Sequence, residues 1–376
     1  MISRISLLAV FIAVTIFGSG KQKDSLIVHE WGTFTTVSRA DGTAYHWNPL
    51  LGPSELPVFV HGASNAREGN CPKCASTLAR METPVLYFYT NREMKVSVKV
   101  DFPSGKITEW FPQASSTNPG INWESVTVLP GSMTELPNDG KKSHYYPARD
   151  TDASTIQVET GTGNEREKFL FYRGIGDFLP PLQARLAGDR LILKNTGSDE
   201  ISPVILFENR QGKMGWEVLD TLTSQADLPR PALGRSIDSL DCELQKALAA
   251  HGLFEKEADA MVKTWRDSWF EEGMRVFYIV PRKATDAILP IAITPLPDQL
   301  ARVFVGRGEI ITPEIAGEIQ DAARKFREGS SEERFTAIKM VRRYGRFAEP
   351  VLREMMTRDN NPSLWPSIWN LVTAAR

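Results

Sequence analysis

Hydrophobic and polar positions alternate along most of the chain up to about residue 222, where β-branched and aromatic residues are also frequent. Alternation with a period of two is typical of strands that bury one face and expose the other. Three such segments, at 85–90, 95–103 and 106–112, follow one another with short polar turns between them. We expect these three segments to form an antiparallel meander.

A second set of strands is expected from residue 165 onward, after a stretch at 131–164 that is rich in Gly, Ser and Asn. Hairpin-type turns are expected at 187–189 and 195–197, because Gly and Asn tolerate the positive φ that such turns need. Short strands with turns between them at regular spacing favour a sandwich. A single large β domain over residues 24–230 is the alternative.

The spacing of apolar residues becomes helical from about residue 236. Ser236 or Ser239 is expected to cap a first helix, which ends at Gly252. In the helix that follows, Trp265 and Trp269 recur at helical spacing with other apolar residues. We therefore expect both tryptophans in the core.

Two strands, at 274–282 and 301–307, are then expected to rejoin the β body. From 312 to 376 the pattern is helical, with Pro313 in the first-turn position that suits it after a Thr312 cap. One apolar stripe of this part consists of Phe335, Ile338 and Val341. The part resembles a HEAT-type helical hairpin, and its expected role is packing or contact with a protein.

These patterns predict a mainly β protein, with an antiparallel, sandwich-like β body in one or two domains, inserted helices and a C-terminal α-helical module. The expected divisions are a signal peptide (1–20), an N-terminal β region (24–130), a second β region (165–310) with a helical insertion (236–272), and the helical module (312–376). The 376 residues are 41% hydrophobic and 24% charged, which suits a folded chain with a sizeable core. A net charge of -2 gives no field that would attract nucleic acid, which is therefore not expected as a partner.

The N-terminus has the pattern of a signal peptide. Arg4 precedes an apolar run at 5–17, and the small residues at 18–20 suit a peptidase site. The run is short for a membrane span, which needs about 20 residues. We expect an exported protein, periplasmic or extracellular, with no membrane span after signal cleavage, and a retained N-terminal anchor is the alternative.

The three cysteines are Cys71 and Cys74, which form a Cys-x-x-Cys loop, and the distant Cys242. In an oxidising compartment the close pair favours a small disulfide loop. One alternative is a zinc site completed by His46 and His61, although their spacing matches no standard pattern. A redox-active pair is another, although the Cys-x-x-Cys lies in a loop rich in Gly, Asn and Ser rather than at the start of a helix. Cys242 is then expected to be a buried free thiol on a helix, and no metal is expected.

The segment at 27–37 places His29 beside Glu30. A zinc metalloprotease helix would need a second histidine four residues after the first, where this chain has Thr33. In a strand, successive side chains point to opposite faces, so these two residues could not bind one metal or share one proton. His29 is then either a buried, hydrogen-bonded strand residue or a site residue.

Glu82, Glu109 and His29 are the candidate catalytic residues. Glu82 precedes a strand, and Glu109 lies beside Trp110. Two carboxyl groups, one with a raised pKa, are what glycoside hydrolysis requires, and tryptophan can stack on sugar rings. Glu271 and Glu272, which follow the tryptophan-rich helix, belong to the same class of candidate. No nucleophile elbow, phosphate loop or dinucleotide fingerprint occurs in the sequence, and no cofactor is expected.

Several distinctive motifs are spread over residues 26–313: VHEWGTFT, LPVFVH, RMETPVLYFY, ITEWFPQA, SWFEEG with RVFYIVPR, and RVFVGR with ITP. Together they resemble a group of uncharacterised, exported bacterial proteins of the kind found in planctomycete-type genomes. The resemblance implies export and a shared fold, and it implies no activity and no site residue. The Cys-Pro-Lys-Cys loop is not associated with the group, which favours the local disulfide.

Two functions of different classes follow. The first is a non-catalytic binding or structural protein of the cell envelope, whose partner is a cell-surface polymer or an envelope protein. The second is a carboxylate-dependent hydrolase of extracellular glycans that uses Glu82 and Glu109, with His29 beside them. A hydrolase needs these side chains to converge in a cleft, whereas a binding protein can leave them apart.

Overall fold

The computed structural model describes residues 25–49, 56–62, 76–358, 366–368 and 370–371. The expected signal peptide and the Cys71–Cys74 loop lie outside the described residues. Among the residues described, no helix is both long enough and apolar enough to cross a membrane.

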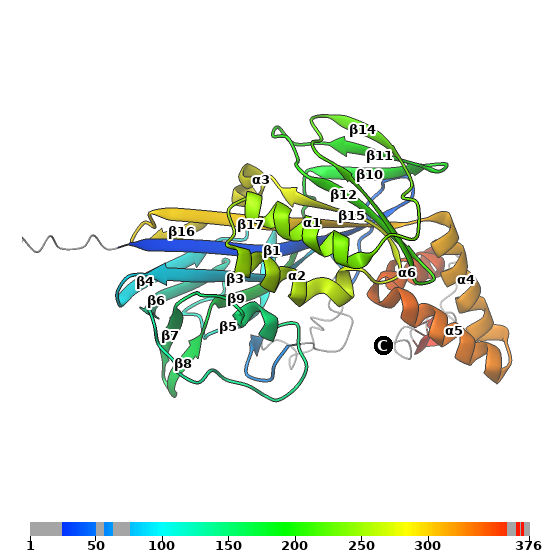
Figure 1. Ribbon diagram of the computed structural model, residues 1–376. Coiled ribbons are helices and arrows are strands. Elements are labelled where there is room, and N and C mark those ends of the chain that lie inside the picture. The colour runs from blue at the N-terminus through cyan, green and yellow to red at the C-terminus, as the bar shows by residue number, and fades with distance from the viewer. Residues whose placement is uncertain (1–24, 50–55, 63–75, 359–365, 369, 372–376) are drawn as a thin grey trace, which may run out of the picture.

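A nine-stranded sheet forms the centre of the molecule (Figure 1). Its strands, in spatial order, are β13 (Lys213–Leu219), β12 (Val204–Arg210), β15 (Gly273–Val280), β17 (Gln299–Ile311), β1 (Leu26–Arg39), β3 (Ala79–Thr90), β9 (Leu170–Gly176), β5 (Gly105–Phe111) and β2 (His61–Gly62). The long central strands β1 and β17 are parallel, and the other neighbours are antiparallel. The sheet takes strands from both β regions expected from the sequence, so it joins them in one layer.

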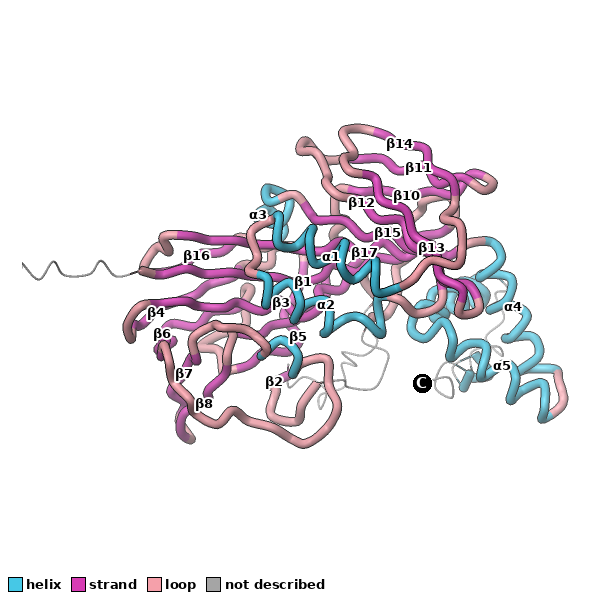
Figure 2. The backbone as a smooth tube through the Cα atoms, viewed as in Figure 1, coloured by secondary structure: helices cyan, strands magenta, loops and turns pink. Residues whose placement is uncertain are grey.

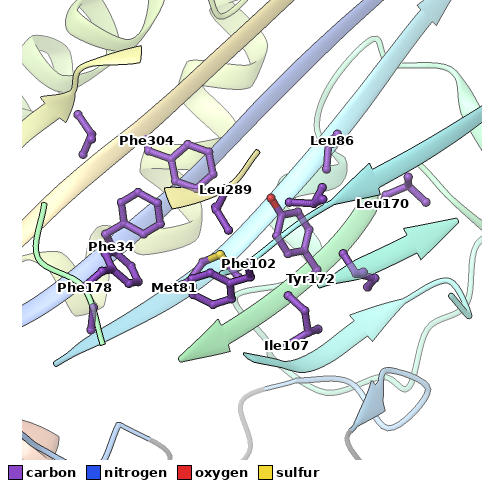
Figure 3. Close-up of a cluster of buried hydrophobic side chains, with 14 of the residues drawn as sticks. Phe34, Met81, Leu86, Phe102, Ile107, Leu170, Tyr172, Phe178, Leu289 and Phe304 are labelled. Carbon is purple, nitrogen blue, oxygen red and sulfur yellow. The ribbon is translucent and has the colours of Figure 1, made fainter. Parts of the chain in front are cut away.

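Two smaller sheets cover one face of the large sheet, which we call the sandwich face. One contains β16 (Ile291–Thr294), β4 (Met94–Val100), β6 (Ile121–Leu129), β7 (Thr155–Thr160) and β8 (Gly163–Glu167), and the other contains β10 (Leu182–Ala187), β11 (Arg190–Asn195) and β14 (Gln225–Pro229). A single apolar core fills this interface, and Figure 3 shows Phe34, Phe304, Met81 and Tyr172 within it. Burial of this apolar area is the main stabilising contribution that holds the layers together.

Helices α1 (Ile237–Ala250) and α2 (Glu255–Trp269) lie on the opposite face, which we call the helix face (Figure 2). Ser236 caps α1 by accepting a hydrogen bond from the backbone N–H of Asp238, as its position in the sequence predicts. Trp265 and Trp269 are buried against the sheet, which confirms their expected place in the core. Cys242 lies on α1 but is exposed, so the expectation of a buried thiol was wrong.

A helical module follows β17 and packs beside one end of the large sheet. It contains α4 (Pro313–Glu328), α5 (Ser331–Tyr344), the 3-10 helix η3 (Gly345–Phe347) and α6 (Ala348–Arg358). Its core includes Val37 of β1 and Ile311 of β17, which fixes the module to the β body. Thr312 caps α4 with Pro313 in the first turn, as predicted. Phe335 is 59% exposed and does not belong to the expected apolar stripe.

The structure confirms the predicted fold class, a mainly β body with inserted helices and a C-terminal helical module. The expected meander was wrong, because β4 pairs with β6 and β16 in the second layer, while β3 and β5 both pair with β9. Alternation places the valines of β4 in a core but does not specify which strand lies beside β4.

The two expected hairpin turns have different outcomes. The turn at Gly188 joins the paired strands β10 and β11, with Gly188 at positive φ, as predicted. The turn at 195–197 joins no hairpin, because β11 pairs with β10 and β14 whereas the next strand, β12, belongs to the large sheet. Asn195 is buried there and donates to backbone carbonyls of residues 199 and 222–223. The short remaining elements are the 3-10 helix η2 (Tyr146–Arg149) and α3 (Arg282–Ile288).

Candidate functional site

His29 and Glu30 point to opposite faces of β1, as the strand pattern predicts. His29 lies on the helix face, fully buried, with its Nδ1 2.7 Å from Oε2 of Glu257 on α2. The same carboxylate accepts hydrogen bonds from the hydroxyl of Tyr89 and the backbone N–H of Phe254, each at 2.7 Å. His29 is therefore a hydrogen-bonded strand residue that ties α2 to the sheet.

Glu30 lies on the sandwich face and forms a second buried group. It accepts hydrogen bonds from Nε of Arg302 and from the hydroxyl of Tyr172. Arg302 also donates from Nη1 to Asp286 and to the carbonyl of Leu289, each at 2.7 Å. Burial opposes the charge on Arg302, but Glu30 raises the pKa of Arg302 above its usual value. We call Glu30, Arg302 and Tyr172 the Glu30 centre.

Glu82 is the most closely bound of the predicted catalytic residues. Its Oε1 accepts a hydrogen bond from Nη1 of Arg346, which belongs to η3 of the helical module. Nε of Arg80 lies 3.5 Å from the same oxygen, and the hydroxyl of Thr35 donates to Oε2 at 3.1 Å. Burial raises the pKa of Glu82, but the charges of Arg346 and Arg80 outweigh it and hold the pKa at about 2.

Further charged residues surround Glu82 on the helix face. The strand register places Arg307 of β17 opposite Thr35, and Thr35 opposite Arg80 of β3. Across the next strands, Glu109 of β5 lies opposite Arg173 of β9. We call the resulting group the Glu82 cluster, and it consists of Arg80, Glu82, Glu109, Arg173, Glu271, Arg275, Arg307, Glu309 and Arg346.

The cluster lies where the sheet meets the C-terminal end of α2 and the helical module. Arg307 donates from Nη2 to Glu271, just beyond α2, at 2.8 Å. The guanidinium carbon of Arg307 lies 4.7 Å from the ring centroid of Phe347 in η3, and that of Arg346 lies 5.1 Å from it. Three parts of the chain that are distant in sequence thus supply one charged region.

The arginines of the cluster differ in how completely their donors are bonded. Every guanidinium nitrogen of Arg275 donates a hydrogen bond. Nε and Nη2 donate to Glu309 at 2.8 and 3.0 Å, and Nη1 and Nη2 donate to the backbone carbonyls of residues 269, 271 and 272. By contrast, Nε of Arg80, Nε of Arg173, and both Nε and Nη1 of Arg307 are buried without a hydrogen-bond acceptor within the described part of the chain. A buried donor left unbonded costs about 1–3 kcal/mol.

The structure brings together two of the three predicted catalytic residues. Glu82 and Glu109 share the helix face with one strand, β9, between them. His29 lies apart from them, further along β1 and against α2. Glu272 also lies apart, where it accepts a hydrogen bond from the backbone N–H of Gln211.

The arginines of the cluster were missed by reasoning from sequence. In β17, Val303, Val305, Arg307 and Glu309 alternate on the helix face, and all four are nearly or fully buried. The available signal was therefore a charged residue at the inward position of an apolar strand. An inward charge is rare without a partner, so it marks a buried group whose partners lie elsewhere in the chain.

The other candidate groups contain fewer charged residues than the Glu82 cluster. His61 lies in β2 with its Nε2 2.9 Å from Glu165, and His46 lies 3.9 Å from Asp177. Within the ranges that the structure describes, no group of three or more His, Cys, Asp or Glu residues is arranged to hold a metal ion. A cavity of about 310 Å³ lies at the end of β15 and the start of β17, and Arg302 and His251 are among the residues that line it.

No protein-family model matches the chain, and no curated protein matches it. Among solved structures, the Fcho1 mu homology domain of Danio rerio with bound Eps15 peptide has a TM-score of 0.28 at 6% identity, covering 76% of this chain and 97% of that chain. The yeast delta-COP-I mu-homology domain has a TM-score of 0.30 at 10% identity, covering 77% and 98%. Its complex with the Dsl1 WxWxV peptide has a TM-score of 0.30 at 9% identity, covering 77% and 97%. Likeness this low supports no argument about function.

Proposed function

We propose that this chain is a non-catalytic, exported binding protein of the cell envelope, and that its ligand is a cell-surface polymer or an envelope protein. One observation carries the proposal: both carboxylate oxygens of Glu82 are bonded to neighbouring side chains in a buried, arginine-rich cluster. The sequence pattern at 1–20 supports export.

Glycoside hydrolysis needs one carboxylic acid with a raised pKa and a second carboxylate that can reach the sugar or a water. Glu82 has a pKa of about 2 and stays ionised, so it cannot supply the proton. Its oxygens also accept hydrogen bonds from Thr35 and Arg346, which weakens the carboxylate as a nucleophile or base. His29 is fully buried beneath α2 and bonded to Glu257, so it does not reach the same substrate.

The hydrolase remains a second candidate function, because Glu82 and Glu109 share one face of the sheet. Glu109 is half-buried and accepts a hydrogen bond from the hydroxyl of Thr108. In this reading Glu109 is the catalytic acid and Glu82 the ionised partner. The two candidate functions differ in whether the protein cleaves a bound glycan and releases reducing ends.

The test uses the chain without residues 1–20 and an insoluble preparation of cell-envelope glycan. We expect the protein to sediment with the glycan and to release no reducing ends. The exposed control Glu124→Gln on β6 should sediment as the wild type does, and Glu109→Gln should sediment at least as strongly, because it removes no cationic group from the Glu82 cluster. Release of reducing ends by the wild type and the Glu124→Gln variant, with loss in Glu109→Gln, would establish the hydrolase instead.

A further inference from the structure

We propose that the Glu82 cluster is a receptor for an oxyanion, the carboxylate, sulfate or phosphate group of a ligand, held by the guanidinium groups of Arg80, Arg173 and Arg307. This inference rests on the proposed binding function, and it adds the site and the chemistry of the ligand. The oxygen atoms of such a group would accept the hydrogen bonds that these guanidinium groups do not make to any described residue.

The donors come from three of four consecutive strands of the sheet, β17, β1, β3 and β9. Arg307 and Arg80 flank Thr35 across β17, β1 and β3, and Arg173 lies on β9, next to β3. Their charges act on one another: burial, and then the charge of Arg173, lower the pKa of Arg80 to about 10. Burial and then the charge of Arg275 lower the pKa of Arg307. An anion placed among them would relieve both effects.

The unbonded atoms belong to side chains that are otherwise held in place. Arg307 is fully buried and uses Nη2 for Glu271, so its Nε and Nη1 remain for a ligand. Arg80 donates from Nη1 to the carbonyl of Pro49 at 2.8 Å, and its Nε, which lies 3.5 Å from Oε1 of Glu82, makes no hydrogen bond to a described residue. Arg173 has only a long contact, 3.3 Å from Nη2 to the hydroxyl of Thr83, among the bonds described for it. Fixed donors of this kind lose little freedom on binding.

Charge and access also fit an anionic group. The cluster holds five arginines and four glutamates, an excess of one positive charge, and the glutamates are already bonded or lie at its edge. The base of the cluster is closed, but the side chains of Arg80, Arg346 and Glu271 expose 13%, 18% and 29% of their surface. A ligand group would enter past these partly exposed side chains.

The test titrates the chain without residues 1–20 with sodium phosphate, sulfate and acetate by calorimetry, at constant ionic strength set with chloride. We expect saturable binding to one site for at least one of the three oxyanions, and none for chloride. The relative affinities for phosphate, sulfate and acetate would then separate a phosphate or sulfate ligand from a carboxylate ligand. Arg307→Gln should weaken that affinity at least tenfold, and Arg307→Lys should weaken it less.

The control is Arg190→Gln, which removes an exposed arginine that is paired with Asp227 on the three-stranded sheet. Its affinity for the oxyanion should equal that of the wild type. Arg173→Gln provides a second cluster variant if Arg307→Gln fails to fold, because Arg173 makes fewer bonds. Circular dichroism should verify the fold of each variant before titration.

Two results would overturn the inference: no saturable binding of any oxyanion to the wild type, or equal affinities in the Arg190→Gln and cluster variants. Absence of anion binding together with intact sedimentation on glycan would remove the oxyanion site and leave the proposed function standing. Anion binding together with release of reducing ends would leave the oxyanion site standing and remove the proposed non-catalytic function.

Discussion

The Glu30 centre and the Glu82 cluster lie on opposite faces of the same sheet and both pair glutamate with arginine, yet they differ in how many guanidinium donors lack an acceptor. In the Glu30 centre, Glu30 is bonded by Arg302 and Tyr172, and one nitrogen of Arg302 has no acceptor among the described residues. In the Glu82 cluster, four guanidinium nitrogens have no acceptor in the described chain. The first group therefore links β1, β9 and β17 of the large sheet and, through Arg302, Asp286 of α3, whereas the second keeps hydrogen-bonding capacity for a ligand.

The largest expected effect on the free energy of unfolding comes from a substitution that breaks the Glu30 centre. Glu30→Leu would leave Arg302 charged and buried without its main partner, and removal of one member of a buried pair costs about 3–5 kcal/mol. We expect a loss of this size in the free energy of unfolding, measured by urea denaturation. The exposed pair on β11 and β14 offers a control, because Asp227→Leu should cost less than about 1 kcal/mol. Equal losses in the two variants would contradict a structural role for Glu30.

The next effect is the pH dependence of folding stability that Glu82 contributes in the Glu82 cluster. The pKa of Glu82 is about 2 in the folded chain and 4.5 as its ordinary value, so the unfolded chain binds the proton more tightly. The stabilisation of the folded chain by the ionised carboxylate of Glu82 is therefore present above pH 4.5 and is lost as the pH falls through 2. A difference of this size corresponds to about 3 kcal/mol.

The measurement compares the wild type with Glu82→Gln by denaturation at several pH values between 6 and 2. The Glu82→Gln variant should lose less stability over this range, because its side chain does not titrate. Parallel curves for the two proteins would show that the arginines do not act on Glu82 as the structure indicates.

The smallest of the three effects concerns the link between the cluster and the helical module. Arg346→Met removes the bond to Glu82 while keeping apolar contact with Phe347, so the module should dock less firmly. We expect a cost of about 1–3 kcal/mol and faster hydrogen exchange in α4–α6. Arg334→Met, an exposed substitution on α5, should leave exchange unchanged. Unchanged exchange in Arg346→Met would place the docking energy in the apolar core alone.

Local features of the fold could be predicted from the sequence because they depend on neighbours in the chain. The caps at Ser236 and Thr312 and the turn at Gly188 rest on interactions within a few residues, and helical periodicity was enough to place the tryptophans of α2 on the buried side. The partner of each strand could not be predicted in this way. The alternation in β4 is the same whether it pairs in a meander or in a second layer, and tertiary packing selects between the two.

The candidate site shows the same division. Glu82 and Glu109 could be singled out by their neighbours in the sequence, and the period of two was enough to separate His29 from Glu30. The arginines were not found, because Arg80, Arg173, Arg307 and Arg346 come from distant segments, and the inward charge of Arg307 in an apolar strand does not by itself identify its partners. A carboxylate with a candidate catalytic role in the sequence thus becomes, in the fold, the counter-ion of an arginine cluster.

The sequence by itself determined which side chains of each strand share a face, where the main helices begin, and that the chain is mainly β with a helical end, because these properties follow from short-range sterics and periodicity. Only the tertiary structure decided that β1 and β17 lie side by side, and that η3 covers the face where their charged residues meet. Coulomb interactions and hydrogen bonds act over a few ångströms of space, whatever the separation along the chain. The balance of donors and acceptors around Glu82 therefore arises only when the layers close.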